Sequence, residues 1–126
     1  LATQGAAVAI AEIDESLGNI VATEIRTQGY ESEAFVMDVS SKSTVDEVCE
    51  KINKRWGQID ILINNAGPRP NVIPTMNLPL EEWDRVLSVG LTGVLLCSQS
   101  VGRLMMERET GTIVNIASVN GINPAA

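Results

Sequence analysis

The sequence predicts an α/β fold, a doubly wound parallel sheet with helices on both faces. Four short apolar runs alternate with stretches of helical periodicity, and these runs cover residues 7–10, 34–37, 59–63 and 112–116. The runs are continuously apolar, which is typical of parallel strands covered on both faces. Each run leads into polar residues or glycine, and open parallel sheets bind ligands at the carboxyl ends of their strands. The pattern therefore predicts a single ligand-binding edge.

Composition limits the possible functions. A chain of 126 residues is enough for one domain and too short for two. Its formal net charge of −7, from 16 acidic and 9 basic residues, argues against binding to nucleic acid or to an anionic membrane. The absence of histidine from the sequence argues against metal sites and excludes a Ser-His-Asp hydrolase. Cys49 and Cys97 are expected to be buried thiols, which suits a cytoplasmic protein.

The helical stretches can be placed by their apolar residues and their ends. Residues 1–5 look like the end of a helix closed by Gly5, with neither an initiator methionine nor a signal peptide. A helix is predicted over residues 15–28, with Gly29 ending it. A second helix is capped by Ser41 or Ser43, runs to residue 56 and is closed by Gly57.

A long irregular stretch follows the third apolar run. Residues 67–79 contain four prolines, and such stretches are often functional. A long helix is then predicted over residues 80–109 and ended by Gly111. Its apolar stripe is too broad for one core-facing side, which predicts a homodimer or homotetramer formed through this helix. No apolar run approaches the roughly 18 residues of a membrane-spanning helix.

Two acidic residues follow the first run. Glu12 can accept hydrogen bonds from the ribose hydroxyls of an adenosine group and would repel a 2′-phosphate, which favours NAD over NADP. The alternative role for such an acid is a helix N-cap, which we favour for Asp14. At the second strand end, Asp38 either accepts from an exocyclic amine such as that of adenine or stabilises a turn, and the sequence does not separate these roles.

The third and fourth runs end on Asn64-Asn65-Ala66-Gly67 and near Ser118. Ala66 and Gly67 would let a flat cofactor approach the backbone, while asparagine side chains can tie strand ends together or orient a sugar. An ordinary turn does not need two successive asparagines, so we favour a functional role. The Ser118 hydroxyl could hydrogen-bond a reacting carbonyl or alcohol, or could cap a helix.

Taken together, these residues resemble the classical short-chain dehydrogenase/reductases. The resemblance rests on Asn64-Asn65-Ala66-Gly67, Glu12, Asp38-Val39, residues 113–118 and the helix segments 83–87 and 91–93, and it covers essentially the whole chain. It implies that residues 1–126 are part of a single NAD(P)-binding Rossmann domain. It also implies hydride transfer between a nicotinamide cofactor, NAD preferred, and a small alcohol or carbonyl substrate.

The resemblance assigns a role to each candidate residue. Glu12 resembles the cofactor-selecting acid, Asp38 with Val39 the adenine contact, and Ser118 the catalytic serine that polarises the substrate oxygen. Asn64, Ala66 and Gly67 resemble the cofactor side of the third strand end. Gly90 is a departure, since it stands where the family usually has an asparagine that helps hold a proton-relay water.

The family pattern also sets expectations about what lies outside this chain. A glycine-rich phosphate loop and first strand are expected before Leu1, and a catalytic tyrosine and lysine after Ala126. That strand would lie between the strands ending at Glu12 and Asn64, so we expect the natural protein to be longer and the isolated chain to be unstable. The alternatives to an enzyme of this family are a non-catalytic dinucleotide-binding sensor or scaffold, which Gly90 favours, and a methyltransferase, which Asn64-Asn65-Ala66-Gly67 disfavours.

Overall fold

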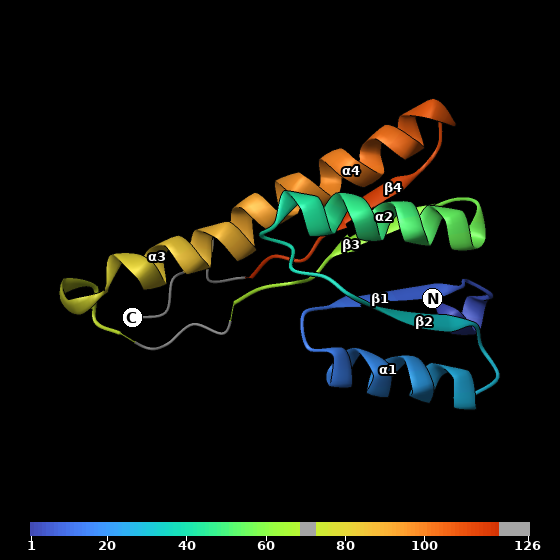
Figure 1. Cartoon of the computed structure of the whole chain (residues 1–126), viewed down its shortest axis with the longest axis horizontal. Helices are drawn as coiled ribbons and strands as arrows, with labels where there is room; N and C mark the ends of the chain where they lie inside the picture. The colour runs from blue at the N-terminus through green and yellow to red at the C-terminus, as the bar shows by residue number, and fades with distance from the viewer. Residues whose placement is uncertain (69–72, 119–126) are drawn as a thin grey trace. The chain divides into compact units, whose positions relative to one another are not determined.

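The computed structural model describes residues 1–68 and 73–118. The chain divides into two compact units, Leu1–Gln58 and Ile59–Ala126 (Figure 1). Both units have parallel strands connected through helices, as the sequence predicts. Val119 and the residues after it, and residues 69–72 of the irregular stretch, lie outside the described part.

The first unit is a parallel strand pair with two helices. Its elements are a 3₁₀ turn (Ala2–Gln4), β1 (Val8–Glu12), α1 (Glu15–Thr27), β2 (Ser32–Val36) and α2 (Lys42–Trp56). The register pairs Val8 with Ser32 and Glu12 with Val36, so both strands end at the same edge. The predicted helix ends are confirmed. Gly5, Gly29 and Gly57 all have φ between 80° and 89°, the left-handed conformation in which helices commonly end.

The two helices of this unit pack on opposite faces of β2. A Cβ built at Gly18 of α1 would lie 3.3 Å from Glu12 Cβ and 3.5 Å from Ala34 Cβ, so this glycine lets α1 approach the strands closely. The next residue along β2, Phe35, contacts Trp56 of α2 with ring centroids 6.2 Å apart. Successive strand residues point to opposite faces, so the doubly wound arrangement is present.

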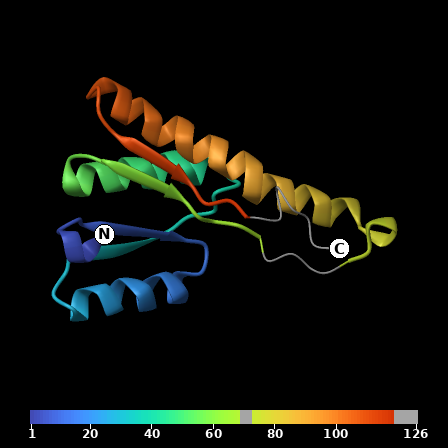
Figure 2. The ribbon, with the colours of Figure 1, turned by 180° about the vertical axis from the view of Figure 1, so that it is seen from behind.

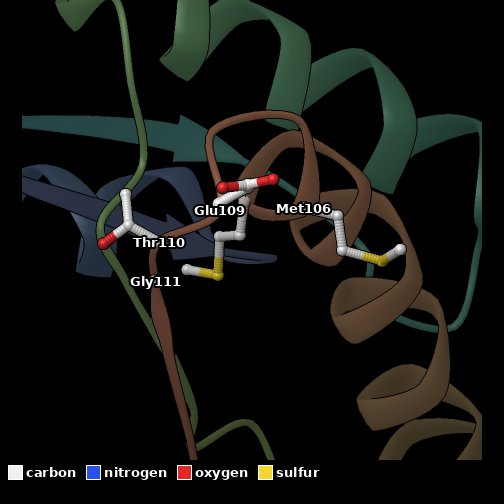
Figure 3. A pocket seen from close by; sticks show the side chains of 5 residues that line it. Met106, Glu109, Thr110 and Gly111 are labelled. Atoms are coloured by element: carbon white, nitrogen blue, oxygen red, sulfur yellow. The ribbon is translucent and has the colours of Figure 1, made fainter.

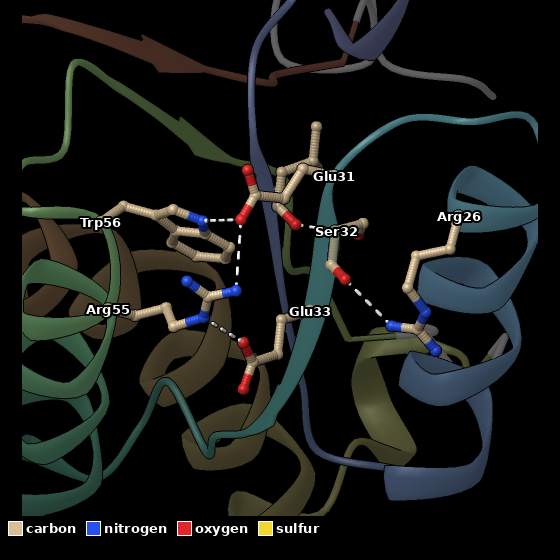
Figure 4. Close-up of polar contacts among 7 residues, drawn as sticks. Arg26, Glu31, Ser32, Glu33, Arg55 and Trp56 are labelled. Atoms are coloured by element: carbon tan, nitrogen blue, oxygen red, sulfur yellow. Dashed lines mark hydrogen bonds and ion pairs between the residues drawn. The ribbon is translucent and has the colours of Figure 1, made fainter.

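A polar cluster fixes the end of α2 to the beginning of β2 (Figure 4). Arg55 Nε donates to Glu33 Oε2 at 3.0 Å, and Trp56 Nε1 donates to Glu31 Oε1 at 2.7 Å. The Arg55 guanidinium also lies 5.2 Å from the centroid of the Trp56 ring. The cluster lies at the amino end of β2, away from the edge where Glu12 and Asp38 lie.

The second unit has the same parallel pairing. Its elements are β3 (Ile61–Asn64), a 3₁₀ turn (Thr75–Asn77), α3 (Leu80–Leu87), a π-helical turn (Ser88–Thr92), α4 (Gly93–Glu107) and β4 (Thr112–Asn115). The register pairs Ile61 with Thr112 and Asn64 with Asn115, and α4 packs against both strands (Figure 2).

The long helix of this unit corrects one expectation. The sequence predicts a continuous helix over 80–109, but the π-helical turn interrupts it and α4 ends at Glu107. The side chains of α4 that face inward recur every four residues, and they are Gly93, Cys97, Val101 and Met105. That spacing is the stripe of one helix face packed on a sheet.

The end of α4 is also different from the prediction. Arg108 is the C-cap and Glu109 adopts φ 54°, a left-handed conformation that glycine usually takes. Gly111, predicted to end the helix, instead lies beside Met105, whose Cγ and Sδ would both be 2.4 Å from a Cβ built there. A side chain at Gly111 would therefore displace Met105. A shallow hollow at this end of α4 is lined by Met105, Met106 and residues 109–111 (Figure 3).

A large apolar surface remains on the second unit. Leu80, Trp83, Leu91 and Leu95 are between 52% and 69% exposed, which agrees with the broad stripe seen in the sequence. By length and composition, Leu80–Glu107 could also cross a membrane, a property that the short apolar runs of the sequence did not predict. A helix that packs on a sheet can pass the same test, and α4 packs on β3 and β4.

Candidate functional site

Glu12 lies at the carboxyl end of β1, and the backbone amides of the next two residues hold its side chain. Glu12 Oε1 accepts from the amide of Ile13 at 2.8 Å and from the amide of Asp14 at 3.1 Å. Its backbone carbonyl accepts from the Met37 amide at 2.9 Å, which continues the β1–β2 pairing to the edge. Glu12 as a residue is half-buried, and these two bonds hold its carboxylate in place before any ligand arrives.

Asp14 is the N-cap of α1, as predicted. Its Oδ1 accepts from the amides of Ser16 and Leu17 at 2.9 and 3.1 Å and from Ser16 Oγ at 2.6 Å. The Ser16 hydroxyl, followed by the Leu17 amide, lowers the pKa of Asp14 below its ordinary value. The cap satisfies amide groups that the first helical turn cannot pair.

Asp38 is at the same edge, just past the end of β2, the strand that pairs with β1. Asp38 Oδ1 accepts from the Ser40 amide at 2.9 Å and from Ser40 Oγ at 2.7 Å, so it stabilises the turn into α2. Val39 lies within this turn. A role of Asp38 and Val39 in contacting adenine remains a prediction, since a carboxylate has further acceptor capacity beyond these two bonds.

Asn64 connects three elements of the second unit. It is 8% exposed, and its Nδ2 donates to Ser98 Oγ of α4 at 3.1 Å and to Asn115 Oδ1 of β4 at 2.8 Å. Its carbonyl accepts from the Ile116 amide at 2.9 Å. The structure therefore confirms that an asparagine at this position joins the ends of two strands.

The residues after Asn64 form an open surface. Asn65, Ala66 and Gly67 are exposed, and a Cβ built at Gly67 would meet no atom of the described chain within 4 Å. Small residues with open space are what a flat ring needs in order to approach a backbone. Ser118 is exposed as well and comes three residues after β4, the strand that pairs with β3.

Each unit therefore brings predicted positions from two paired strands to one strand edge. In the first unit these are Glu12 and Asp38, and in the second they are residues 64–67 and Ser118. Sequence reasoning missed Ser98 and Asn115 as partners of Asn64. No local pattern could have found them, because they lie 34 and 51 residues away.

The whole of residues 1–126 matches the family model described as short chain dehydrogenase. The chain belongs to this family. It is 38% identical over 119 residues to 2,3-dihydro-2,3-dihydroxybenzoate dehydrogenase of Bacillus subtilis (strain 168), a match that covers 94% of this chain and 45% of that protein. The chain thus spans about half the length of the curated relatives it matches.

Two solved structures extend the comparison to three dimensions. NAD+-bound xylitol dehydrogenase is 30% identical, with a TM-score of 0.92 and coverage of 97% of this chain and 47% of its own. A gluconate 5-dehydrogenase from Burkholderia cenocepacia J2315, in complex with NADP and tartrate, is 34% identical, with a TM-score of 0.87 and coverage of 95% and 47%. The Rossmann-like α/β fold of this chain is thereby confirmed, and one of these relatives holds NAD+ while the other holds NADP.

Proposed function

We propose that this chain is part of a nicotinamide-dependent oxidoreductase that transfers a hydride between NAD and a secondary alcohol or ketone. Family membership supports the hydride chemistry, and the relatives named above are dehydrogenases, which gives no support to a non-catalytic sensor. The observation that carries the choice of cofactor is the position of Glu12, a preorganised carboxylate at the end of β1.

Glu12 suits a ribose diol better than a phosphate. A carboxylate can accept from both hydroxyls of an adenosine ribose, whereas the 2′-phosphate of NADP would meet a like charge. Within the described residues, Glu12 accepts hydrogen bonds from the amides of Ile13, Asp14 and Met37, and these partners carry no positive charge.

We assign the other candidate residues to the remaining parts of such a cofactor and substrate. Asp38 and Val39 would contact adenine, and Asn64, Ala66 and Gly67 would form the cofactor side of the β3 end. The Ser118 hydroxyl would hydrogen-bond the substrate oxygen and orient it for hydride transfer, which the bound cofactor supplies. Residues 1–126 would then be part of a single NAD(P)-binding Rossmann domain.

Titration of the full-length protein with NADH and NADPH, followed by fluorescence, tests the role of Glu12. We expect tighter binding of NADH, and we expect Glu12→Gln to reduce the preference by about tenfold, the size of one hydrogen bond to a charged group. Glu15→Gln is the matched control, because Glu15 is an exposed glutamate at the start of α1 and does not lie at the strand end.

The outcomes separate the parts of this proposal. Tighter binding of NADPH by the unaltered protein would exclude the role given to Glu12. Binding of NADH without oxidation of any secondary alcohol by NAD would favour the sensor or scaffold. Binding of neither cofactor would exclude the oxidoreductase.

We also propose an oligomeric state and a cellular location for this protein. The exposed apolar residues of α3, the π-helical turn and α4 are expected to be covered in a homodimer or homotetramer, since Trp83 of α3 and Leu91 of the turn are 52% and 66% exposed. A cytoplasmic location is proposed from the two buried cysteine thiols, which suit a reducing compartment.

A further inference from the structure

The π-helical turn brings Gly90 beside Pro68, the residue that follows the Asn64–Gly67 segment. A Cβ built at Gly90 would lie 3.6 Å from Pro68 Cδ, and, apart from the backbone of its own helix and its chain neighbours, no other described atom would be within 4 Å. This is an ordinary van der Waals distance. The proline ring thus occupies the space into which a larger side chain at position 90 would extend.

Gly90 differs from Gly102, a glycine further along the same run of helix. Gly102 of α4 has no described atom within 4 Å of a Cβ built there. Glycine is unfavourable inside any helix. A neighbouring side chain can favour glycine at a helical position by limiting the space for a larger residue, whereas open space cannot. π-Helical turns also occur frequently at functional sites.

We propose that Gly90 and Pro68 are a matched pair of positioning residues. The proline ring limits the side chain at position 90 to about the size of alanine, and the ring in turn holds the Ala66–Gly67 segment where a nicotinamide cofactor meets the end of β3. This inference rests on the proposed function for the identity of the ligand, but the contact itself does not.

The pair predicts a steep dependence on side-chain size at position 90. Alanine adds only the Cβ, which fits at 3.6 Å from Pro68. Valine adds two γ carbons and strongly prefers one χ1 rotamer in a helix, so it has little freedom to turn away from the ring. Valine at position 90 should therefore displace Pro68 and the residues before it.

The test compares variants of the full-length protein by NADH titration and by thermal unfolding. We expect Gly90→Val to bind NADH about tenfold more weakly than Gly90→Ala does, since small displacements at a cofactor site have large effects. Gly102→Val makes the same substitution within the helix without a facing proline, and it should leave the dissociation constant unchanged. Pro68→Ala combined with Gly90→Val should recover most of the lost affinity.

Three results would overturn the pair. They are unchanged NADH binding in Gly90→Val, an equal loss in Gly102→Val, and no recovery in the double variant. If the unaltered protein bound neither NADH nor NADPH, the proposed function would fail, and the pair would then be judged by the melting temperatures alone. Additive effects of Pro68→Ala and Gly90→Val on the melting temperature would exclude coupling between the two residues.

Discussion

The two units of this chain stabilise their strand ends in different ways. In Leu1–Gln58, Glu12, Asp14 and Asp38 accept hydrogen bonds from residues one to three positions further along the chain. In Ile59–Ala126, Asn64 instead binds Ser98 and Asn115, which are 34 and 51 residues away. Local contacts can form as soon as the turn forms, whereas distant contacts need the packed helix and the paired strand.

The helix ends show the same contrast. α1 and α2 are followed by Gly29 and Gly57 in a left-handed conformation, the usual way to end a helix. α4 instead passes through Glu109 with φ 54°, and its nearby glycine accommodates Met105. Variants of each unit can therefore show whether stability depends on local or on tertiary contacts.

The largest effect is expected from Gly111→Ala. Its Cβ would lie 2.4 Å from both Met105 Cγ and Met105 Sδ, so the buried methionine must move, and we expect a loss of about 2 kcal/mol in the free energy of unfolding. Urea denaturation of the full-length protein measures this. Gly57→Ala is the control from the first unit, because φ there is 80° but the space is open, and it should cost only the backbone strain of about 1 kcal/mol. Equal losses would mean that packing at Met105 is unimportant.

A smaller loss is expected from Asn64→Ala. The substitution removes the donor to Ser98 Oγ and Asn115 Oδ1 and leaves these partly buried acceptors to find water, at a cost of about 1.5 kcal/mol. Asn65→Ala provides the matched control, since Asn65 is exposed, and it should unfold at nearly the same urea concentration as the unaltered protein. A comparable loss in both variants would contradict the tertiary role of Asn64.

The smallest effect is expected from Asp14→Asn, and it should depend on pH. The pKa of Asp14 is lowered in the folded state by the Ser16 hydroxyl and the Leu17 amide. Its charged form therefore adds stability at pH values above 3.8, the ordinary pKa of an aspartate. That contribution is lost as the pH falls through the lower pKa that Asp14 has in the folded state. Melting temperatures of the two proteins should differ slightly at pH 7 and converge in acid. A difference that stays constant with pH would mean that the charge of Asp14 adds nothing to the cap.

Much of the fold and part of the candidate site could be predicted from single residues and their spacing. Continuous apolar runs located all four strands, and glycines located the ends of α1 and α2, because strand burial and left-handed backbone are local requirements. Asp14 was identified as a cap for the same reason. The π-helical turn was not predicted, since residues 80–109 carry a helical pattern throughout and nothing local marks the extra residue in the turn.

The sequence by itself determined the family, the order of strands and helices, and the identity of the polar residues at the strand ends. Only the tertiary structure decided what those residues touch. Asn64 joins β3, β4 and α4, and Gly90 faces Pro68, because side chains distant along the chain meet only when the strands pair and the helix packs. The spacing of residues along the chain predicts helices and strands, but it does not identify the distant residue that a given side chain will contact.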